Sequence, residues 1–103
     1  MTSIDTFEAM LTGGKDSALV RYSLGNEYYK LEQYEKSAEH LQKAVEHDPK
    51  YSGAWKLLGK ALAHARRKDE AAQAFQQGIE VAQGKGDIQA AKEMTVYLNR
   101  LKK

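Results

Sequence analysis

The chain repeats itself at a fixed interval, the one that separates Gly25 from Gly59, and this period constrains the fold more than any other feature of the sequence. Residues that suit a helical core recur at that interval: Leu24 and Leu58, Gly25 and Gly59, Ala38 and Ala72, Leu41 and Phe75, Val45 and Ile79. A fixed period of about 34 residues is typical of stacked helix hairpins. Such stacks usually present a curved surface to another chain, so the repeat predicts binding rather than catalysis.

Apolar residues at helical spacing, separated by turn signals, predict a short leading helix and five major helices. The leading helix is expected over residues 3–12, ahead of Gly13-Gly14, and the next from a cap at Asp16 or Ser17 to about Leu31. The others are expected over residues 34–47, 51–65 and 69–82, and from a cap at Asp87 onward. Because the turns are short, consecutive helices must pack antiparallel, which predicts an all-α stack of hairpins.

The apolar stripes of these helices indicate one domain, residues 1–103. Its expected units are an N-terminal helix and turn (1–17), a first hairpin (18–51), a second hairpin (52–85) and a C-terminal capping helix (86–103). The first hairpin is expected to bury a stripe of Leu24, Tyr28 and Leu31. The last helix is expected to bury Ile88, Ala91, Met94, Leu98 and Leu101.

Two glycines stand inside predicted helices, where glycine costs about 1 kcal/mol relative to alanine. Gly25 and Gly59 therefore each need a compensating reason to be there. Close approach of the second helix of each hairpin supplies one, with Leu41 and Phe75 filling the neighbouring space. A bulky residue at either glycine is expected to destabilise the fold.

Composition excludes several classes of protein. The chain has no cysteine, which removes disulfides, thiolate metal sites and a cysteine nucleophile, and favours a reducing cytoplasm. Residues 1–10 include Asp5 and Glu8 and lack both a basic leader and an apolar run. Neither a signal peptide nor a membrane span is expected from this segment.

The net charge of +2 is unevenly distributed along the chain. Residues 1–51 hold six Lys/Arg against nine Asp/Glu, whereas residues 52–103 hold ten against five, so the halves carry −3 and +5. This asymmetry has two interpretations: ordinary solvated helix faces, or a C-terminal half that attracts an acidic partner.

The repeat resembles the tetratricopeptide repeat, a helix hairpin with the pattern W-x2-L-G-x2-Y followed by small, aromatic and proline positions. The second unit matches through Trp55, Leu58, Gly59, Leu62, Ala71 and Phe75, with Gly78 at the later small position and Gln83 in place of proline. The first unit matches through Leu24, Gly25, Tyr28, Ser37, Leu41, Ala44 and Pro49, with Arg21 in place of tryptophan. The resemblance covers residues 18–85 and implies a right-handed superhelical stack.

The resemblance also implies a concave groove lined by the first helix of each hairpin. The residues that fall at groove positions and carry suitable chemistry are Tyr22, Asn26, Tyr29, Lys30, Lys56, Lys60, His64 and Met94, with Ala90 and Tyr97 as further candidates in the last helix. Tyrosine offers area and a hydrogen bond together, asparagine can bridge a peptide backbone, and lysine attracts a carboxylate. The implied function is a small adaptor that holds a peptide or partner helix, with an acidic ligand favoured. For the tyrosines, packing between helices is an equal alternative.

Other functions find less support in the sequence. His40 and His47 lack the spacing of a zinc site, Gly13-Gly14-Lys15-Asp16-Ser17 follows no strand as a phosphate loop would, and no nucleophile and base are paired. The sequence therefore predicts no enzyme, no metal and no cofactor. Chaperone tails are disfavoured because Tyr22 and Leu57 stand where the family's carboxylate-binding members are expected to have lysine and asparagine.

Two further alternatives stay open at this stage. Nucleic-acid binding rests on two short basic clusters, residues 66–68 and Arg100, Lys102 and Lys103, which are a weak electrostatic footprint beside 14 acidic residues. Self-association rests on the exposed end faces that so short a stack must have, and on the opposite charge of its halves.

Overall fold

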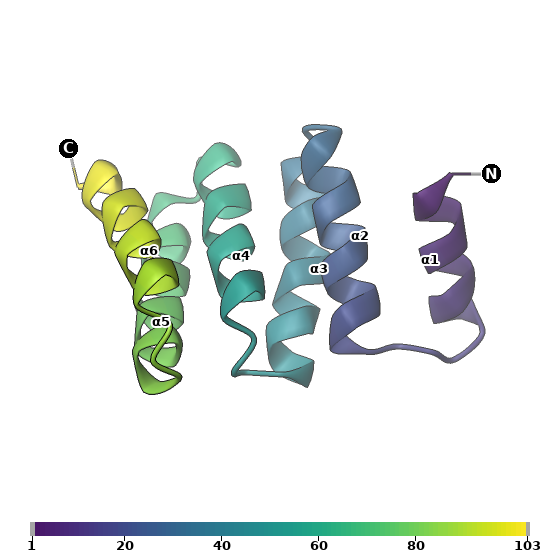
Figure 1. The fold of residues 1–103 in the computed structure, drawn as a ribbon. Coiled ribbons are helices and arrows are strands. Elements are labelled where there is room, and N and C mark those ends of the chain that lie inside the picture. Colours follow the sequence, from purple (N-terminus) through teal and green to yellow (C-terminus); the bar gives the residue numbers. More distant parts are fainter. Residues whose placement is uncertain (1, 103) are drawn as a thin grey trace.

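The computed structural model describes residues 2–102, which form a row of α-helices with no strand among them (Figure 1). The helices are α1 (Ser3–Thr12), α2 (Ala18–Lys30), α3 (Tyr34–His47), α4 (Ser52–His64), α5 (Lys68–Gly84) and α6 (Ile88–Leu101). The all-α prediction and the order of helices are confirmed. Of the predicted units, the first and last residues of the chain lie outside the described part.

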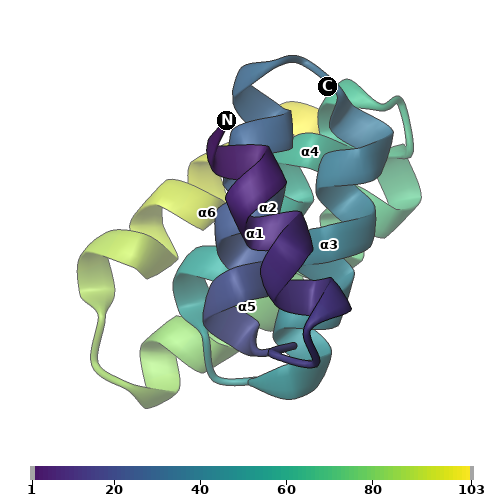
Figure 2. The same cartoon turned by 90° about the vertical axis from the view of Figure 1, so that its right-hand side faces the viewer.

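The helices stack as a right-handed array of antiparallel hairpins. α2 pairs with α3 and α4 with α5, while α1 packs on α2 at one end and α6 packs on α5 at the other. Figure 2 views this row along its length, with α1 in front of α2. α2 also contacts α4, and α4 contacts α6. By contrast, α3 and α5 do not contact each other within residues 2–102. The first helices of the hairpins are thus drawn together along one face, as a curved stack requires.

The two hairpins close around equivalent glycines. A methyl group built on Gly25 would collide with the side chain of Leu41, and one built on Gly59 would lie 2.5 Å from Cε1 of Phe75. Gly25, Gly59, Leu41 and Phe75 are all buried. The prediction of close helix approach at both glycines is confirmed.

The turns inside the two hairpins are also equivalent, although they contain no glycine. Glu32 and Arg66, which occupy the same position in the two repeats, adopt the left-handed backbone conformation with φ of 59° and 64°. In each turn, an amide shortly after the helix bonds back to a carbonyl of its last turns: Gln33 to Tyr28, and Arg67 to Leu62. These bonds offset the cost of a positive φ at residues with side chains.

Three details differ from the sequence predictions. α5 runs to Gly84 rather than ending at Ala82, because no side chain or proline stops it there. Leu31 is 56% exposed, because it lies after the last residue of α2, in the turn. Ile88 is 67% exposed, because it lies with Lys92, Thr95 and Val96 along a hollow in the surface rather than in the core with Met94 and Leu98.

Polar contacts attach α1 to the rest of the stack, since none of its residues is fully buried. The Tyr28 hydroxyl donates to Glu8 of α1 at 3.1 Å, and Nε2 of His40 lies 3.7 Å from the same carboxylate. In the segment that follows α1, Asp16 accepts hydrogen bonds from Arg21 at 2.8 and 2.9 Å. The Arg21 guanidinium, and after it His47, lower the pKa of Asp16 to about 2. Burial of the His40 ring lowers its pKa. The N-terminal end of the stack is therefore covered, but by a weakly packed helix.

Within residues 2–102, no helix has both the length and the apolar character needed to span a bilayer.

Candidate protein-binding groove

α4 lies between α2 and α6 and contacts both (Figure 1). Three predicted groove residues meet across α2 and α4, since Tyr29 contacts both Lys60 and His64. Tyr22, Asn26 and Tyr29 of α2 are half-buried, as are Lys56 and Lys60 of α4. Lys30 and His64, at the ends of these helices, are exposed. These side chains can therefore present polar atoms to a ligand while their stems cover the core.

The tyrosines of this face stack on one another. Tyr22 stacks on Tyr51 with ring centroids 5.0 Å apart, and Tyr34 stacks on His64 at 4.5 Å. Tyr29 meets both Tyr34 and His64 edge to face, at 5.4 and 5.7 Å. Burial raises the pKa of Tyr29 and of Tyr51. The rings thus take part in packing between helices and still form part of the surface, so the two interpretations of the tyrosines are compatible.

A cluster of cations and tyrosines lies where α4 meets α6. The Lys60 ammonium lies 5.4 Å from the ring centroids of both Tyr29 and Tyr97, and the Arg100 guanidinium lies 5.7 Å from that of Tyr97. We call Lys60, Tyr97 and Arg100 the cation cluster. It borders a cleft of about 290 Å³ whose other walls are Ala63, His64, Phe75 and Leu101.

The remaining lysines of the groove already have carboxylate partners. The Lys56 ammonium lies 3.2 Å from Glu93 of α6, and the Lys30 ammonium lies 2.7 Å from Glu27. By contrast, no carboxylate of residues 2–102 forms an ion pair with Lys60 or Arg100. The cation cluster is therefore the part of this face whose charge is not already balanced by a contact.

Met94 does not belong to the groove surface, and its assignment to the groove is wrong. The Met94 side chain is fully buried and packs against Gly78 of α5, where the two helices approach closely. The cause is a change in the repeat interval. α4 begins at Ser52, one repeat period after the start of α2, but α6 begins at Ile88 rather than at Gly86, where the same period would place it. The delay arises because α5 has 17 residues where α3 has 14.

The longer interval also changes which residues of α6 stand at the positions equivalent to those of α4. Counting from the first residue of each helix, Val96 and Arg100 of α6 correspond to Lys60 and His64 of α4. Glu93, Val96, Tyr97 and Arg100 line a second, smaller hollow of about 160 Å³. The helix cap at Asp87, which follows the cap at Tyr51 by more than one repeat period, was the available signal of this shift.

The other polar clusters singled out in the sequence are engaged within the stack. Arg67, from the basic turn between α4 and α5, donates to Glu70 at 2.6 Å and to Glu35 at 2.8 Å, and these bonds raise its pKa. His47 lies 3.0 Å from Asp16, and His40 lies 3.1 Å from Arg21. Lys103, one of the basic residues near the C-terminus, lies outside the described part. The central basic residue of the first cluster is thus neutralised locally.

Comparisons with known proteins agree with this architecture. The sequence model of the tetratricopeptide repeat matches residues 22–88. The TPR repeat-containing protein PA0015 of Pseudomonas aeruginosa is 51% identical over 98 residues, which cover 95% of this chain and 93% of that protein. The chain belongs to the tetratricopeptide repeat family.

Solved structures of other proteins share this fold. The solution structure of protein BPP2914 from Bordetella parapertussis has a TM-score of 0.83 at 42% identity, and the alignment covers 98% of this chain and 88% of that one. The second TPR domain of human RPAP3, solved in complex with the HSP70 peptide SGPTIEEVD, has a TM-score of 0.75 at 22% identity, over 96% and 91% of the two chains. The tetratricopeptide repeat fold is typical of modules for protein–protein interaction, which is the general function that this likeness supports.

Proposed function

We propose that the concave face of α2, α4 and α6 binds an extended segment of another protein, and that an acidic residue of this segment docks on the cation cluster. The observation that carries the proposal is the position of Lys60 and Arg100. Both cations lie over the Tyr97 ring, beside a cleft, without an ion-pair partner in residues 2–102. A carboxylate is the complementary group for two such cations, and Arg can bind one through two parallel hydrogen bonds.

The surroundings of the cation cluster favour a ligand that combines charge with an apolar side chain. Phe75, Ala63 and Leu101 provide apolar walls for the cleft, and Tyr29 and Tyr97 hold Lys60 in place. Asn26 lies on the same face and can donate to and accept from a peptide backbone at once. The ligand is therefore expected to be an extended segment with an acidic residue next to an apolar one. The HSP70 peptide bound by the RPAP3 domain, SGPTIEEVD, combines such residues.

Peptide binding to matched variants tests the proposal. An array of nine-residue peptides, with acidic and apolar residues at varied positions, is probed with the wild-type protein, and the peptides that bind are measured in solution by fluorescence anisotropy. Lys60→Gln and Arg100→Gln are each expected to weaken binding about tenfold, because each removes a charge-assisted hydrogen bond. Lys43→Gln is the control, since it removes the same charge from the exposed side of α3, outside the cleft that the cation cluster borders.

The salt dependence of the peptide affinity provides a second test. Raising the salt from about 50 to about 500 mM is expected to weaken wild-type binding more than binding by either variant, because fewer charges remain to be screened. Equal affinity of wild type, Lys60→Gln and Arg100→Gln for every peptide that binds would contradict the proposal, and so would an array on which neutral peptides bind as well as acidic ones.

A further inference from the structure

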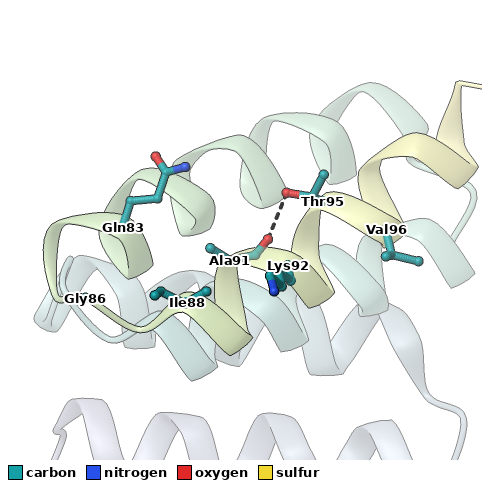
Figure 3. A pocket seen from close by; sticks show the side chains of 7 residues that line it. All are labelled: Gln83, Gly86, Ile88, Ala91, Lys92, Thr95 and Val96. Carbon is teal, nitrogen blue, oxygen red and sulfur yellow. Dashed lines mark hydrogen bonds between the residues drawn. The ribbon is translucent and has the colours of Figure 1, made fainter.

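The outward side of α6 forms a hollow of about 590 Å³, separate from the cleft at the cation cluster. Figure 3 shows the side chains that line it: Gln83, Gly86, Ile88, Ala91, Lys92, Thr95 and Val96. Ile88 and Val96 are 67% and 49% exposed and both line this hollow, so its surface is partly apolar. We call Ile88, Ala91, Lys92, Thr95 and Val96 the open face.

The two hairpins of the same chain indicate what kind of element this face accepts. Aligned from their first residues, Thr95 of α6 corresponds to Gly59 of α4 and to Gly25 of α2. Gly59 is covered by Phe75 of α5, and Gly25 is covered by Leu41 of α3. In both hairpins, a second helix therefore lies antiparallel on this side of the first. α6 has the corresponding side but, within residues 2–102, no helix on it.

The side chains of the open face define the shape of a matching helix. Ala91 corresponds to Trp55 of α4 and to Arg21 of α2, so much of the bulk found in the hairpins is missing from α6. Thr95 carries a side chain where the hairpins have glycine, which keeps a covering helix further from the α6 backbone. A large apolar side chain on that helix is needed to fill the space between Ile88, Ala91 and Val96, as Phe75 and Leu41 do in the hairpins.

The charges of the hairpin helices indicate the net charge expected of a matching helix. In each hairpin the first helix is net positive and the second is net negative. α4 carries Lys56 and Lys60 and no carboxylate, and α5 carries three carboxylates and one lysine. α2 carries two cations and one carboxylate, and α3 carries three carboxylates and two lysines. α6 repeats the first pattern, with Lys92 and Arg100 against Glu93, and no carboxylate of residues 2–102 pairs with Lys92.

A second copy of this chain fits the open face poorly. An antiparallel copy of α6 would bring Lys92 close to its own copy, which is repulsive. α1, at the other end of the stack, packs on α2, and its large apolar residues are half-buried: Ile4, Phe7, Met10 and Leu11. Its exposed residues are Ser3, Asp5, Thr6, Ala9 and Thr12, with no large apolar side chain among them. The complementary helix has an acidic surface and a large apolar residue, and neither end of the chain offers that combination.

We propose that the open face of α6 docks an amphipathic, net-negative helix of a partner protein, which completes α6 as a third hairpin. The partner helix lies antiparallel to α6, with an aromatic or leucine side chain over Ala91 and a carboxylate near Lys92. The open face adjoins the groove through Val96, which also lines the small hollow beside Tyr97 and Arg100, but it shares no residue with the cleft at the cation cluster.

The chain itself provides a probe for the open face. A peptide with the sequence of α5, residues 68–84, carries the required apolar residue and net negative charge. A hydrocarbon staple between positions 73 and 77, which are exposed in the stack, keeps it helical, because an isolated helix of this length is marginal in water. Titration into the isotope-labelled full chain is expected to shift the amide resonances of residues 88–96 in proportion to bound peptide.

Four variants separate the proposal from unspecific binding. Lys92→Glu is expected to weaken the peptide about fivefold, and Ile88→Asp about tenfold. Phe75→Ala within the peptide is expected to weaken it about tenfold. Lys43→Glu on the exposed side of α3 makes the same charge change outside both the groove and the open face, and is expected to alter affinity less than twofold. Thermal unfolding of each protein variant checks that the fold is retained.

A tethered version decides the matter if the free peptide binds too weakly to measure. The same α5 sequence is joined behind residue 103 through a flexible glycine–serine linker, which raises its effective concentration to the millimolar range. Slower hydrogen exchange of the amides of residues 91–98 than in the untethered chain is expected. The proposal is overturned if exchange there is unchanged, if the shifts map to α2 and α4, or if sedimentation shows that two copies of the chain occupy the face.

Discussion

The two hairpins of the stack share one backbone plan and fill it differently. In the first, α3 presses Leu41 against Gly25, and the buried Ser37 hydroxyl donates to the Gly25 carbonyl at 2.7 Å. In the second, α5 presses Phe75 against Gly59, and Ala71 stands where the first hairpin has serine. Phe75 also stacks on Tyr97 at 5.5 Å, which links the second hairpin to α6. One hairpin is thus fixed partly by a buried hydrogen bond and the other mainly by aromatic area.

The largest expected effect comes from removing the side chain that covers each glycine. Phe75→Ala is expected to lower the free energy of unfolding by about 4 kcal/mol, and Leu41→Ala by about 3 kcal/mol, because both leave a cavity and the aromatic ring fills more space. Urea unfolding followed by circular dichroism measures both values. An equal loss at the two sites would contradict the view that the second hairpin depends more on its aromatic ring.

Adding a methyl group at the glycines is expected to have the next largest effect. Gly25→Ala and Gly59→Ala should each cost about 2 kcal/mol, although alanine is the better helix former by about 1 kcal/mol, because the new methyl collides with Leu41 or Phe75. The same urea unfolding experiment shows whether each variant is less or more stable than the wild type.

Gly84→Ala is the matched control for these glycine variants. Gly84 lies in the last turn of α5, and a methyl group there would meet no atom within 4 Å. This variant is expected to stabilise the chain by about 0.5 kcal/mol, from helix propensity alone. Stabilisation by alanine at Gly25 or Gly59 as well would show that the helices do not approach as described.

A smaller effect is expected at the buried hydroxyl of the first hairpin. Ser37→Ala removes the bond to the Gly25 carbonyl and is expected to cost about 1 kcal/mol. Ala71→Ser places a hydroxyl at the equivalent site of the second hairpin and should change stability by less, since it can donate to the Gly59 carbonyl in the same way. Thermal unfolding of the two variants measures both changes in stability. A larger change for Ala71→Ser than for Ser37→Ala would contradict the view that the buried hydroxyl matters more in the first hairpin.

The smallest expected effect is at Asp16, which joins the segment after α1 to the first hairpin. The pKa of Asp16 is lowered from 3.8 to about 2 by its hydrogen bond with Arg21 and, less, by His47. The stabilisation is therefore fully present above about pH 4 and is lost as the pH falls toward 2. Asp16→Asn is expected to cost about 0.5 kcal/mol or less at pH 7, because the carboxylate is exposed.

Unfolding at pH 7 and at pH 2 measures the Asp16 contribution as a difference. The variant and the wild type should converge at the lower pH, whereas Glu80→Gln, an exposed carboxylate of the second hairpin, should match the wild type at both. A gap between Asp16→Asn and wild type that is as wide at pH 2 as at pH 7 would exclude the ion pair as its cause.

The sequence predicted the hairpins well because their determinants are local or periodic. The helix starts at Ser17 and Asp87, the turn near Glu32 and the close approach at both glycines follow from residue type and from the repeat period. The groove was predicted less well. Lys60 lies over the rings of Tyr29 and Tyr97, but Lys56 is paired with Glu93, and Met94 is in the core.

The period, the class of fold and the family follow from the sequence alone, since each depends on residues that recur at a fixed spacing along one chain. The folded chain was needed to show which charges of the groove are balanced, where α6 departs from the period and which side of α6 lacks a covering helix. These properties depend on distances between helices, which no spacing along the chain contains. The greater length of α5, 17 residues against 14 in α3, rotates and shifts everything after it, and a constant interval cannot express that change.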